Sequence, residues 1–519
     1  MIMVPRGDDL SWEAMSRSLP RPSRTALLLG AAFLLLLVGG IGLAWMLARQ
    51  GVRSPLRVVL VTSSAAATVP TLETGQGRAI GALVQEHLEY YGGFAVTSVT
   101  EVPADLELLR GQRHTLLLQL EPRRQGQNLE LSYRHVWGRQ LEKGKAPGWV
   151  VHQATALPPA EAFETLLREF PRVVKVTPTL LAPRAPGVFW DMVQAAAWRL
   201  RNQNLEQAMA LAERGTRQEP ACAGTWILLG NLRYRWTLDR PGSFRAEQSE
   251  TEALLQRGLV LAPGHPRAAF LLSLLRSDSG NQREALDLLL QARRKQPYNP
   301  TLLTGIAYAA RGAGLLPLAR RAMDLRDELA FARLAPQAVD ITCLYTGEVA
   351  RFEASLQEQP GHLRSTSGVL PFYRGYLALV RGDRELAHQE FRMASTLAHG
   401  YPNILRLSEI YDLILEGRKE EAWKKLREYD QERIGMREPD GEFTIRLAEA
   451  YALIGDRASA MEMATRAFAR GFGCTEWYER SPMLEPLRGL PKWHALIQHL
   501  RERQSLMEDR FPVGLLEEN

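Results

Sequence analysis

Cysteine is scarce in this sequence of 519 residues. The three cysteines, Cys222, Cys343 and Cys474, are odd in number and far apart, which excludes a disulfide framework and gives no metal-ligand spacing. We expect them to be small buried hydrophobic residues in helices. A strong net charge is also missing, since the formal charge of +6 is mild for this length and disfavours a nucleic-acid binder.

Motifs of known catalytic chemistry are missing too. The sequence contains no P-loop, nucleophile elbow or paired-carboxylate motif. The segment GQGRAIG, Gly75 to Gly81, has the spacing G-x-G-x-x-x-G and does not follow a strand directly, so it predicts a loop that enters a helix and not a dinucleotide site. MDLRDEL, Met323 to Leu329, lacks the asparagine of a kinase catalytic loop, because Ala332 stands in that place.

The ten histidines are scattered along the chain. His494 and His499 are five residues apart and do not share a helical face as metal ligands at i and i+4 do. His388 is expected on an exposed face of a repeat helix. We therefore expect no metal site, no cofactor and no enzymatic activity.

One long apolar run indicates a membrane protein. TALLLGAAFLLLLVGGIGLAWMLA, Thr25 to Ala48, carries no charge and is long enough to span a bilayer as a helix. A cleaved signal peptide would have a shorter apolar region that ends at a small-residue cleavage site, and the Arg49–Gln50 that follows is a poor one. We therefore predict a single uncleaved transmembrane helix over 25–48, preceded by a short tail over 1–24.

The orientation of this helix is not fixed by charge. Arginines flank both of its ends in equal number, so the positive-inside rule is nearly balanced: Arg17, Arg21 and Arg24 precede it, and Arg49, Arg53 and Arg57 follow it. Gly40 and Ala44 form a small-xxx-small pair, a weak indication that two anchors associate as a homodimer.

A small α+β domain is predicted over residues 55–172. β-branched and alternating apolar runs predict strands, and apolar residues at helical spacing predict helices. The expected strands cover 57–64, 94–99, 114–122, 128–138 and 148–157, and the expected helices cover 77–93, 103–111 and 159–170. TPTLLAPRAPG then indicates a Pro-rich linker over 173–186.

From residue 187 to 470 the chain is helical with a period. Ala285 and Ala319 are 34 residues apart, and Ala387 follows two such units later. RPGSFRAEQ, over 240–248, supplies the insertion that lengthens the earlier interval. A 34-residue helix-turn-helix period is typical of tetratricopeptide repeats. We expect about eight repeats, the fifth of them degenerate, with close helix approach at small residues: Ala208, Gly230, Ala285, Ala319, Ala387, Ala422 and Ala460.

The last repeat needs a cap, because a solenoid leaves one apolar face uncovered at its end. SPMLEPLRGLPKWHALIQHL predicts it: Met483, Leu484 and Leu487 pack back, and Trp493, Leu496, Ile497 and Leu500 form a final amphipathic helix. The cap is expected over 471–505, followed by a tail over 506–519.

This ending resembles that of bacterial membrane-anchored signalling proteins with tetratricopeptide repeats. Their final repeat leads into a motif of the form acidic/Ser-Pro-x-Leu-x-Pro-Leu-Arg-x-x-Pro-aromatic, matched here by Ser481, Pro482, Leu484, Pro486, Leu487, Arg488, Pro491 and, one residue late, Trp493. Residues 55–172 resemble the TolB-N-like domain that precedes the repeats in many of these proteins. The families are serine/threonine kinases, adenylate cyclases and CadC-like regulators, and this sequence shows no such output domain before its anchor.

The fold class expected is therefore mostly α: a transmembrane helix, a small TolB-N-like α+β domain, and an α-solenoid with a C-terminal capping helix. The resemblance implies a bacterial inner-membrane protein with most of the chain in the periplasm. Such solenoids bind protein or peptide partners mainly through the first helix of each pair. The residues expected to face inward there are Trp190, Asn231, Tyr234, Arg267, Phe270, Tyr308, Arg311, Phe372, Tyr376 and Tyr411.

Three functions remain open on the sequence. The first is a membrane-anchored, non-enzymatic scaffold that captures partners on this concave stripe. The second is the sensor half of a split or degenerate kinase, cyclase or transcription-regulator system, acting through a separate protein. The third is an enzyme with unrecognised chemistry.

Overall fold

The computed structural model of this chain describes residues 56–62, 72, 75–103, 106–143, 147–170, 180–238, 244–330, 341–357, 368–397, 402–433 and 441–517. The predicted tail over 1–24 and the predicted membrane span, Thr25–Ala48, lie outside these residues. No helix in the described part of the chain is long and apolar enough to cross a membrane. The anchor therefore stays a prediction.

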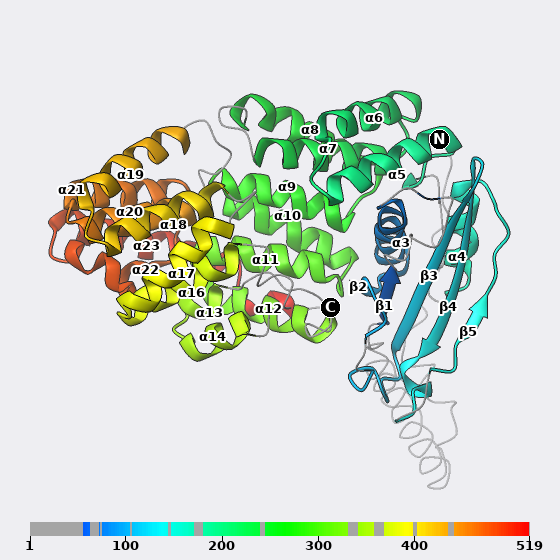
Figure 1. Cartoon of the computed structure of the whole chain (residues 1–519), viewed down its shortest axis with the longest axis horizontal. Helices are drawn as coiled ribbons and strands as arrows, with labels where there is room; N and C mark the ends of the chain where they lie inside the picture. Colours follow the sequence, from blue (N-terminus) through cyan, green and yellow to red (C-terminus); the bar gives the residue numbers. More distant parts are fainter. Residues whose placement is uncertain are drawn as a thin grey trace, which may run out of the picture. The chain divides into compact units, whose positions relative to one another are not determined.

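The α+β part is a five-stranded sheet in the order β2-β1-β3-β4-β5 (Figure 1). The strands are β1 (Arg57–Thr62), β2 (Ala95–Val99), β3 (Thr115–Gln125), β4 (Asn128–Trp137) and β5 (Val150–His152). β1 pairs in parallel with β2 and β3, whereas β3, β4 and β5 pair antiparallel. Helix α3 (Gln76–Gly92) makes the β1–β2 crossover, and α4 (Pro159–Arg168) follows β5. These elements lie where the sequence predicts them.

The helix predicted over 103–111 does not form. Among its described residues, the segment from Glu107 to Gly111 forms turns, with backbone hydrogen bonds from Leu109 and Arg110 to Leu106. A helix this short forms too few hydrogen bonds to offset the conformational entropy lost in helix nucleation. The turns instead bury Leu109 against Val59, Leu117 and the other apolar residues on one face of the sheet.

The opposite face of the sheet shares a core with the first helices of the solenoid. One apolar cluster contains residues of β1, β3, β4, α3 and α4 together with α5 (Pro186–Leu200). The rings of Phe163 on α4 and Phe189 on α5 meet edge to face at 6.0 Å. At the described end of the predicted linker, Leu181 and Ala182 are buried. The solenoid thus begins inside the core of the α+β domain.

The described residues contain eight helix pairs between 186 and 469. Six of the second helices carry a buried alanine at the predicted position, and Ala208, Ala285, Ala319, Ala387, Ala422 and Ala460 are all 0% exposed. The pairs are α5 with α6 (Leu205–Gln218), α7 (Ala223–Leu238) with α8 (Phe244–Leu261), α9 (Pro266–Asp278) with α10 (Gln282–Lys295), α11 (Pro300–Ala313) with α12 (Leu316–Ala330), α13 (Thr342–Tyr345) with α14 (Val349–Gln357), α16 (Val369–Arg381) with α17 (Arg384–Leu397), α18 (Pro402–Leu415) with α19 (Lys419–Arg433), and α20 (Gly441–Ile454) with α21 (Arg457–Ala469).

Local chemistry explains these pairs. Gly230 on α7 admits Leu255 of α8, because a Cβ added there would lie 2.7 Å from a Leu255 methyl carbon. Asn299 caps α11 by accepting a hydrogen bond from the Leu302 amide, and Gly314 ends that helix with a φ of 85°. The fifth pair is the degenerate one, as predicted, since α13 has only 4 residues and α14 only 9.

The segment predicted to cap the last repeat forms short helices and one long helix. It consists of α22 (Thr475–Arg480), the 3-10 turns η4 (Pro482–Leu487) and α23 (Pro491–Arg510), and the end of the chain adds η5 (Val513–Leu516). The seven predicted apolar residues of the cap are buried, each 8% exposed or less. The two prolines that interrupt the helical pattern, Pro482 and Pro486, lie in η4, and Pro491 starts α23.

The end of the chain returns to the middle of the solenoid. Phe511 and Leu516 are buried in the apolar cluster of α10, α11 and α12. Arg293 of α10 donates hydrogen bonds to the backbone oxygens of Leu515 and Leu516, the latter at 2.6 Å. Figure 1 shows the C-terminus beside α12. The solenoid therefore closes on itself, which the sequence did not predict.

Candidate functional site

The predicted concave stripe maps onto the first helices of the pairs, but it is not one open groove. Trp190 lies on α5, Asn231 and Tyr234 on α7, Arg267 and Phe270 on α9, Tyr308 and Arg311 on α11, Phe372 and Tyr376 on α16, and Tyr411 on α18. The chain itself covers much of this stripe. Helix α3 lies against the early repeats, and α20 with the cap lies against the later ones.

Helix α3 makes polar contacts along the early repeats. Gln76 donates to Gln194 of α5 at 2.8 Å, and Asn299, before α11, donates to Glu89 at 2.9 Å. Arg267, one of the predicted binding residues, has its Nε 3.9 Å from the Glu86 carboxylate. The side of α3 that faces away from the sheet therefore occupies the place expected for a bound helix.

Trp190 also has an internal partner. Its indole N–H donates to the backbone oxygen of Gln127 at 3.1 Å, and the guanidinium carbon of Arg124 lies 4.3 Å from its ring centroid. Only 5% of the residue is exposed. The structure thus corrects the expectation for Trp190, which joins the β3–β4 hairpin to the solenoid because the hairpin reaches α5.

Burial shifts the ionisation of several groups beside α3. It raises the pKa of Glu89 to about 7, although hydrogen bonds from Gln85 and Asn299 act in the opposite direction. It lowers the pKa of His87 to about 4 and that of His265 to about 3. Both rings are therefore neutral near pH 7, and the contact between α3 and the solenoid carries a carboxyl group close to its titration point.

The later part of the stripe is closed. Phe372, Tyr376 and Tyr411 are 0% exposed, so they are core residues in this structure and offer no surface to a partner. Phe372 packs against the ring of Phe391 on α17, whereas α20 lies against the two tyrosines. The Tyr376 hydroxyl donates to Glu449 of α20 at 2.6 Å, and the Tyr411 hydroxyl donates to the Arg446 backbone oxygen at 3.1 Å.

Glu449 is the centre of this closure. Its carboxylate accepts hydrogen bonds from Tyr376 at 2.6 Å, from the Trp477 indole at 2.9 Å and from the Ser481 hydroxyl at 2.8 Å. Burial raises the pKa of Glu449, with Arg446 opposing the shift. One buried carboxyl group therefore joins the sixth repeat, the last repeat and the cap.

A second carboxylate joins the middle repeats to the last one. Glu442 of α20 accepts hydrogen bonds from Arg311 of α11 at 2.9 Å and from the Tyr345 hydroxyl at 2.8 Å. Burial alone would raise the pKa of Glu442, but Arg311 and Arg446 together hold it below its usual value. Arg311 is thus paired within the chain, since its guanidinium meets α20.

Arg446 lies between these two carboxylates and is 1% exposed. Its guanidinium carbon lies 4.5 Å from the Tyr376 ring centroid, and its Nη2 lies 3.8 Å from Glu442. Sequence reasoning missed Glu442, Arg446 and Glu449. A signal was present, because these charged residues recur at i, i+4 and i+7 and so share one face of a largely apolar helix.

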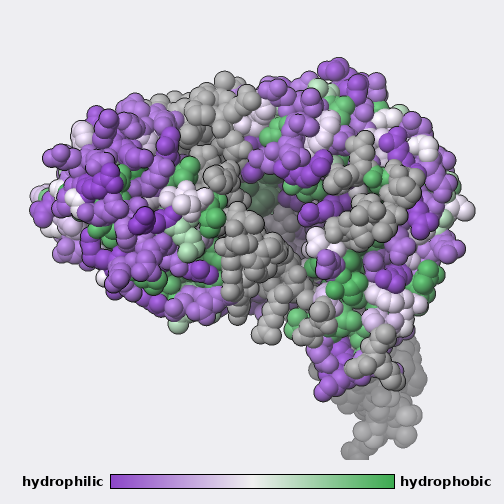
Figure 2. All heavy atoms as spheres, in the orientation of Figure 1, coloured by the Kyte–Doolittle hydropathy of each residue, from purple (hydrophilic) through white to green (hydrophobic). Residues whose placement is uncertain are grey.

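The accessible remainder of the stripe is short. Phe270 and Tyr308 are partly exposed on α9 and α11, and the Arg267 side chain is 34% exposed. Asn231 and Tyr234 are each 8% exposed and mostly buried. Figure 2 shows a hollow near the middle of this face, over the helices labelled α9 to α11 in Figure 1. A small pocket is lined by residues of α9, α10, α11 and α20 together with Phe472: Ser277, Gln282, Tyr308, Gly312, Gly441, Glu442 and Phe472.

The sequence matches no protein-family model and no curated protein. Among solved structures, the crystal structure of yeast Tom70 is similar at 11% sequence identity and a TM-score of 0.34, over 64% of this chain and 66% of that chain. The crystal structure of the P58(IPK) TPR domain is similar at 14% identity and a TM-score of 0.18, over 62% of this chain and 99% of that domain. The chain thus spans about two thirds of the Tom70 chain.

The 34-residue period and the eight described helix pairs identify residues 186–469 as a solenoid of the tetratricopeptide type. In this part of the chain the observed helix pairs match the helix-turn-helix units expected from the 34-residue period. The α+β domain has the strand and helix order predicted for it, apart from the missing short helix.

Proposed function

We propose that this protein is a non-enzymatic scaffold that binds a protein or peptide partner on the open part of its concave face. The observation that carries the proposal is the group of Arg267, Phe270 and Tyr308 on the consecutive first helices α9 and α11, of which Tyr308 lines a small pocket. Aromatic and arginine side chains next to a depression are the residues that contribute most to binding at protein interfaces. The adjoining parts of the stripe are covered by α3 and by α20.

The geometry also bears on the shape of the partner. Helix α3 already lies on the early repeats, with its axis spanning contacts from α5 to the start of α11. A second whole helix has no room on those repeats while α3 stays in place. We therefore expect the open part to accept a short segment with an apolar anchor that packs on Phe270 and Tyr308.

A photo-crosslinking amino acid placed at position 270 tests this proposal. We expect Phe270→benzoylphenylalanine to yield a discrete crosslinked partner in cells, because the side chain is partly exposed on the first helix α9. The matched control is Val260→benzoylphenylalanine on α8, where the side chain is 68% exposed on a second helix. The same partner crosslinked equally from position 260, or none from position 270, would contradict the proposal.

We also propose that residues 25–48 anchor the chain in a bacterial inner membrane with residues 55–519 on the periplasmic side. The uncharged apolar run supports the anchor, and the resemblance to membrane-anchored signalling proteins supports the orientation. The full chain is expected to stay in the membrane fraction at alkaline pH and to be cleaved by protease added to spheroplasts. Release by alkali would refute the anchor, and protection from protease would refute the orientation.

A further inference from the structure

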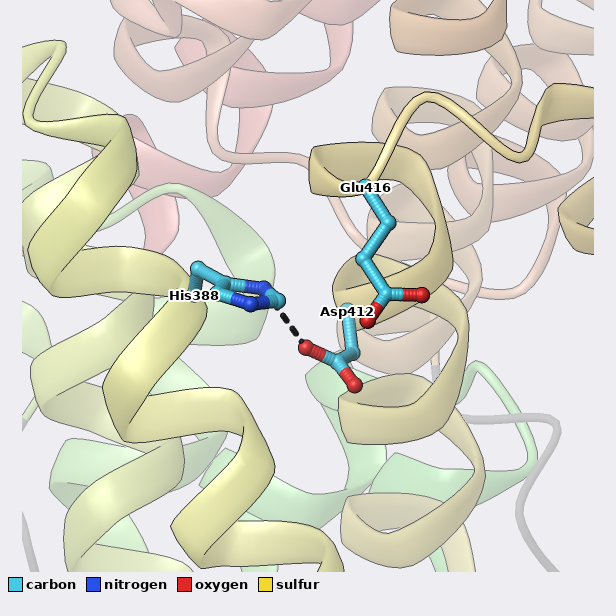
Figure 3. Close-up of side chains that lie close together, drawn as sticks. All are labelled: His388, Asp412 and Glu416. Atoms are coloured by element: carbon cyan, nitrogen blue, oxygen red, sulfur yellow. Dashed lines mark ion pairs between the residues drawn. The ribbon is translucent and has the colours of Figure 1, made fainter.

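Three side chains with metal-binding atoms meet between the sixth and seventh helix pairs. His388 lies on α17, Asp412 lies in the last turn of α18, and Glu416 follows directly after the end of α18. One ligand atom from each lies within 4.8 Å of the other two. Figure 3 shows the His388 ring pointing at the Asp412 carboxylate, with the Glu416 carboxylate beside it. None of the three belongs to the closure around Glu449 or to the proposed partner site.

The distances are close to those of a shared cation. His388 Nδ1 and Asp412 Oδ1 are 2.8 Å apart. Two ligands of a tetrahedral Zn²⁺, each bonded at about 2.0–2.1 Å, stand roughly 3.3 Å apart, so this pair needs to open by about 0.5 Å. The Glu416 amide, just past the end of α18, donates to the Asp412 backbone oxygen at 3.0 Å, which keeps the two carboxylates on the same side of the chain. Only a rotation of the Glu416 side chain is needed to bring the third donor closer.

The surroundings of Asp412 favour a bound cation, whereas Arg418 competes with a cation for the Glu416 carboxylate. The His388 and Asp412 side chains are only 29% and 20% exposed. His388 Nδ1 and Asp412 Oδ1 are both buried, and neither has a hydrogen-bond partner among the described residues. The Arg418 guanidinium lies 2.9 Å from the Glu416 carboxylate and 2.6 Å from the Glu421 carboxylate. Arg418 therefore keeps its ion pair with Glu421 if the Glu416 side chain rotates toward a metal ion.

We propose that His388, Asp412 and Glu416 bind a first-row divalent transition metal ion such as Zn²⁺, which joins the sixth and seventh helix pairs. One imidazole and two carboxylates suit Zn²⁺ and Co²⁺ better than Mg²⁺, which prefers oxygen ligands and keeps its waters. This proposal differs from the expectation that His388 lies on an exposed face of a repeat helix. The inference does not rest on the proposed partner site.

The test uses the purified full chain after its metal has been removed with a chelator. We expect calorimetry to find one Zn²⁺ ion per chain, and Co²⁺ to give visible ligand-field absorbance. His388→Ala and Asp412→Asn should each weaken Zn²⁺ binding by roughly 10-fold or more and abolish the Co²⁺ absorbance. The thermal unfolding midpoint of the unaltered chain should rise with Zn²⁺ and not with Mg²⁺.

A matched control is available on α23. His499 lies 3.5 Å from Glu502 at i+3, so it forms a surface histidine–carboxylate pair that lacks a third donor. His499→Ala should leave the stoichiometry, the affinity and the Co²⁺ absorbance unchanged. Far-UV circular dichroism confirms that each variant is folded. Zn²⁺ binding that is equal in the unaltered chain and in His388→Ala, or no Co²⁺ absorbance at all, would overturn the proposal.

Discussion

Replacing Glu449 by alanine is expected to lower the free energy of unfolding by about 3–5 kcal/mol, because three buried donors lose their acceptor at a cost of roughly 1–3 kcal/mol each. The substitution leaves the Tyr376 hydroxyl, the Trp477 indole and the Ser481 hydroxyl without their acceptor in the core. It also removes a carboxyl group that interacts electrostatically with the buried guanidinium of Arg446. Urea unfolding followed by far-UV circular dichroism measures the loss.

Glu449→Gln is the matched control for that variant. The amide keeps the size of the side chain and one acceptor oxygen, so the expected loss is smaller than for alanine, about 1–3 kcal/mol. If Glu449→Ala lowered the free energy of unfolding by less than about 1 kcal/mol, the closure around this carboxyl group would not contribute to stability as described.

Replacing Glu89 by glutamine is expected to stabilise the protein at alkaline pH. Burial raises the pKa of Glu89 from 4.5 to about 7. Its ionised form is therefore disfavoured in the folded protein, and the folded state loses stability as the pH rises from about 4.5 to about 7. This increase in the pKa of Glu89 corresponds to a loss of roughly 3 kcal/mol in the free energy of unfolding. Glutamine remains neutral and can still accept from Asn299, so this loss is absent.

The measurement compares the free energy of unfolding of both proteins between pH 5 and pH 8. The difference in favour of Glu89→Gln should be small near pH 5 and should approach roughly 3 kcal/mol at pH 8. The buried histidines His87 and His265 destabilise the folded state as the pH falls below about 6.5, but equally in both proteins. Glu121→Gln, at an exposed position on β3, should show no such trend. A difference independent of pH would contradict the burial of an ionisable Glu89.

Local patterns made much of the fold predictable from the sequence. The helix pairs follow from apolar residues at helical spacing and from small residues such as Ala285 and Ala319, which recur because two helices must approach closely at those points. The cap followed from the same argument, because the last repeat needs a cover for its apolar face. The helix expected over 103–111 was wrong because its short apolar pattern serves the sheet, through Leu109.

The closure of the solenoid could not be predicted in this way. Glu442 and Arg311 are 131 residues apart, and their meeting depends on a small rotation that adds up from one pair to the next. Tyr376 and Tyr411 lie on first helices, as predicted. Their positions in the sequence do not reveal that Tyr376 would donate to the Glu449 side chain and Tyr411 to the Arg446 backbone oxygen, both on α20. His388 and Asp412 lie on different helices and show no common spacing.

Hydrogen exchange followed by mass spectrometry tests most directly whether the chain fills its own concave face. In the unaltered protein we predict slow exchange for the amides of α3, α16 and α20, comparable with the core strand β1, because these helices are packed on both sides. In Glu449→Ala, α16, α20 and α22 should exchange faster while α3 stays protected. Fast exchange of α3 or α20 in the unaltered protein would show that the stripe is open, and would contradict the internal closure.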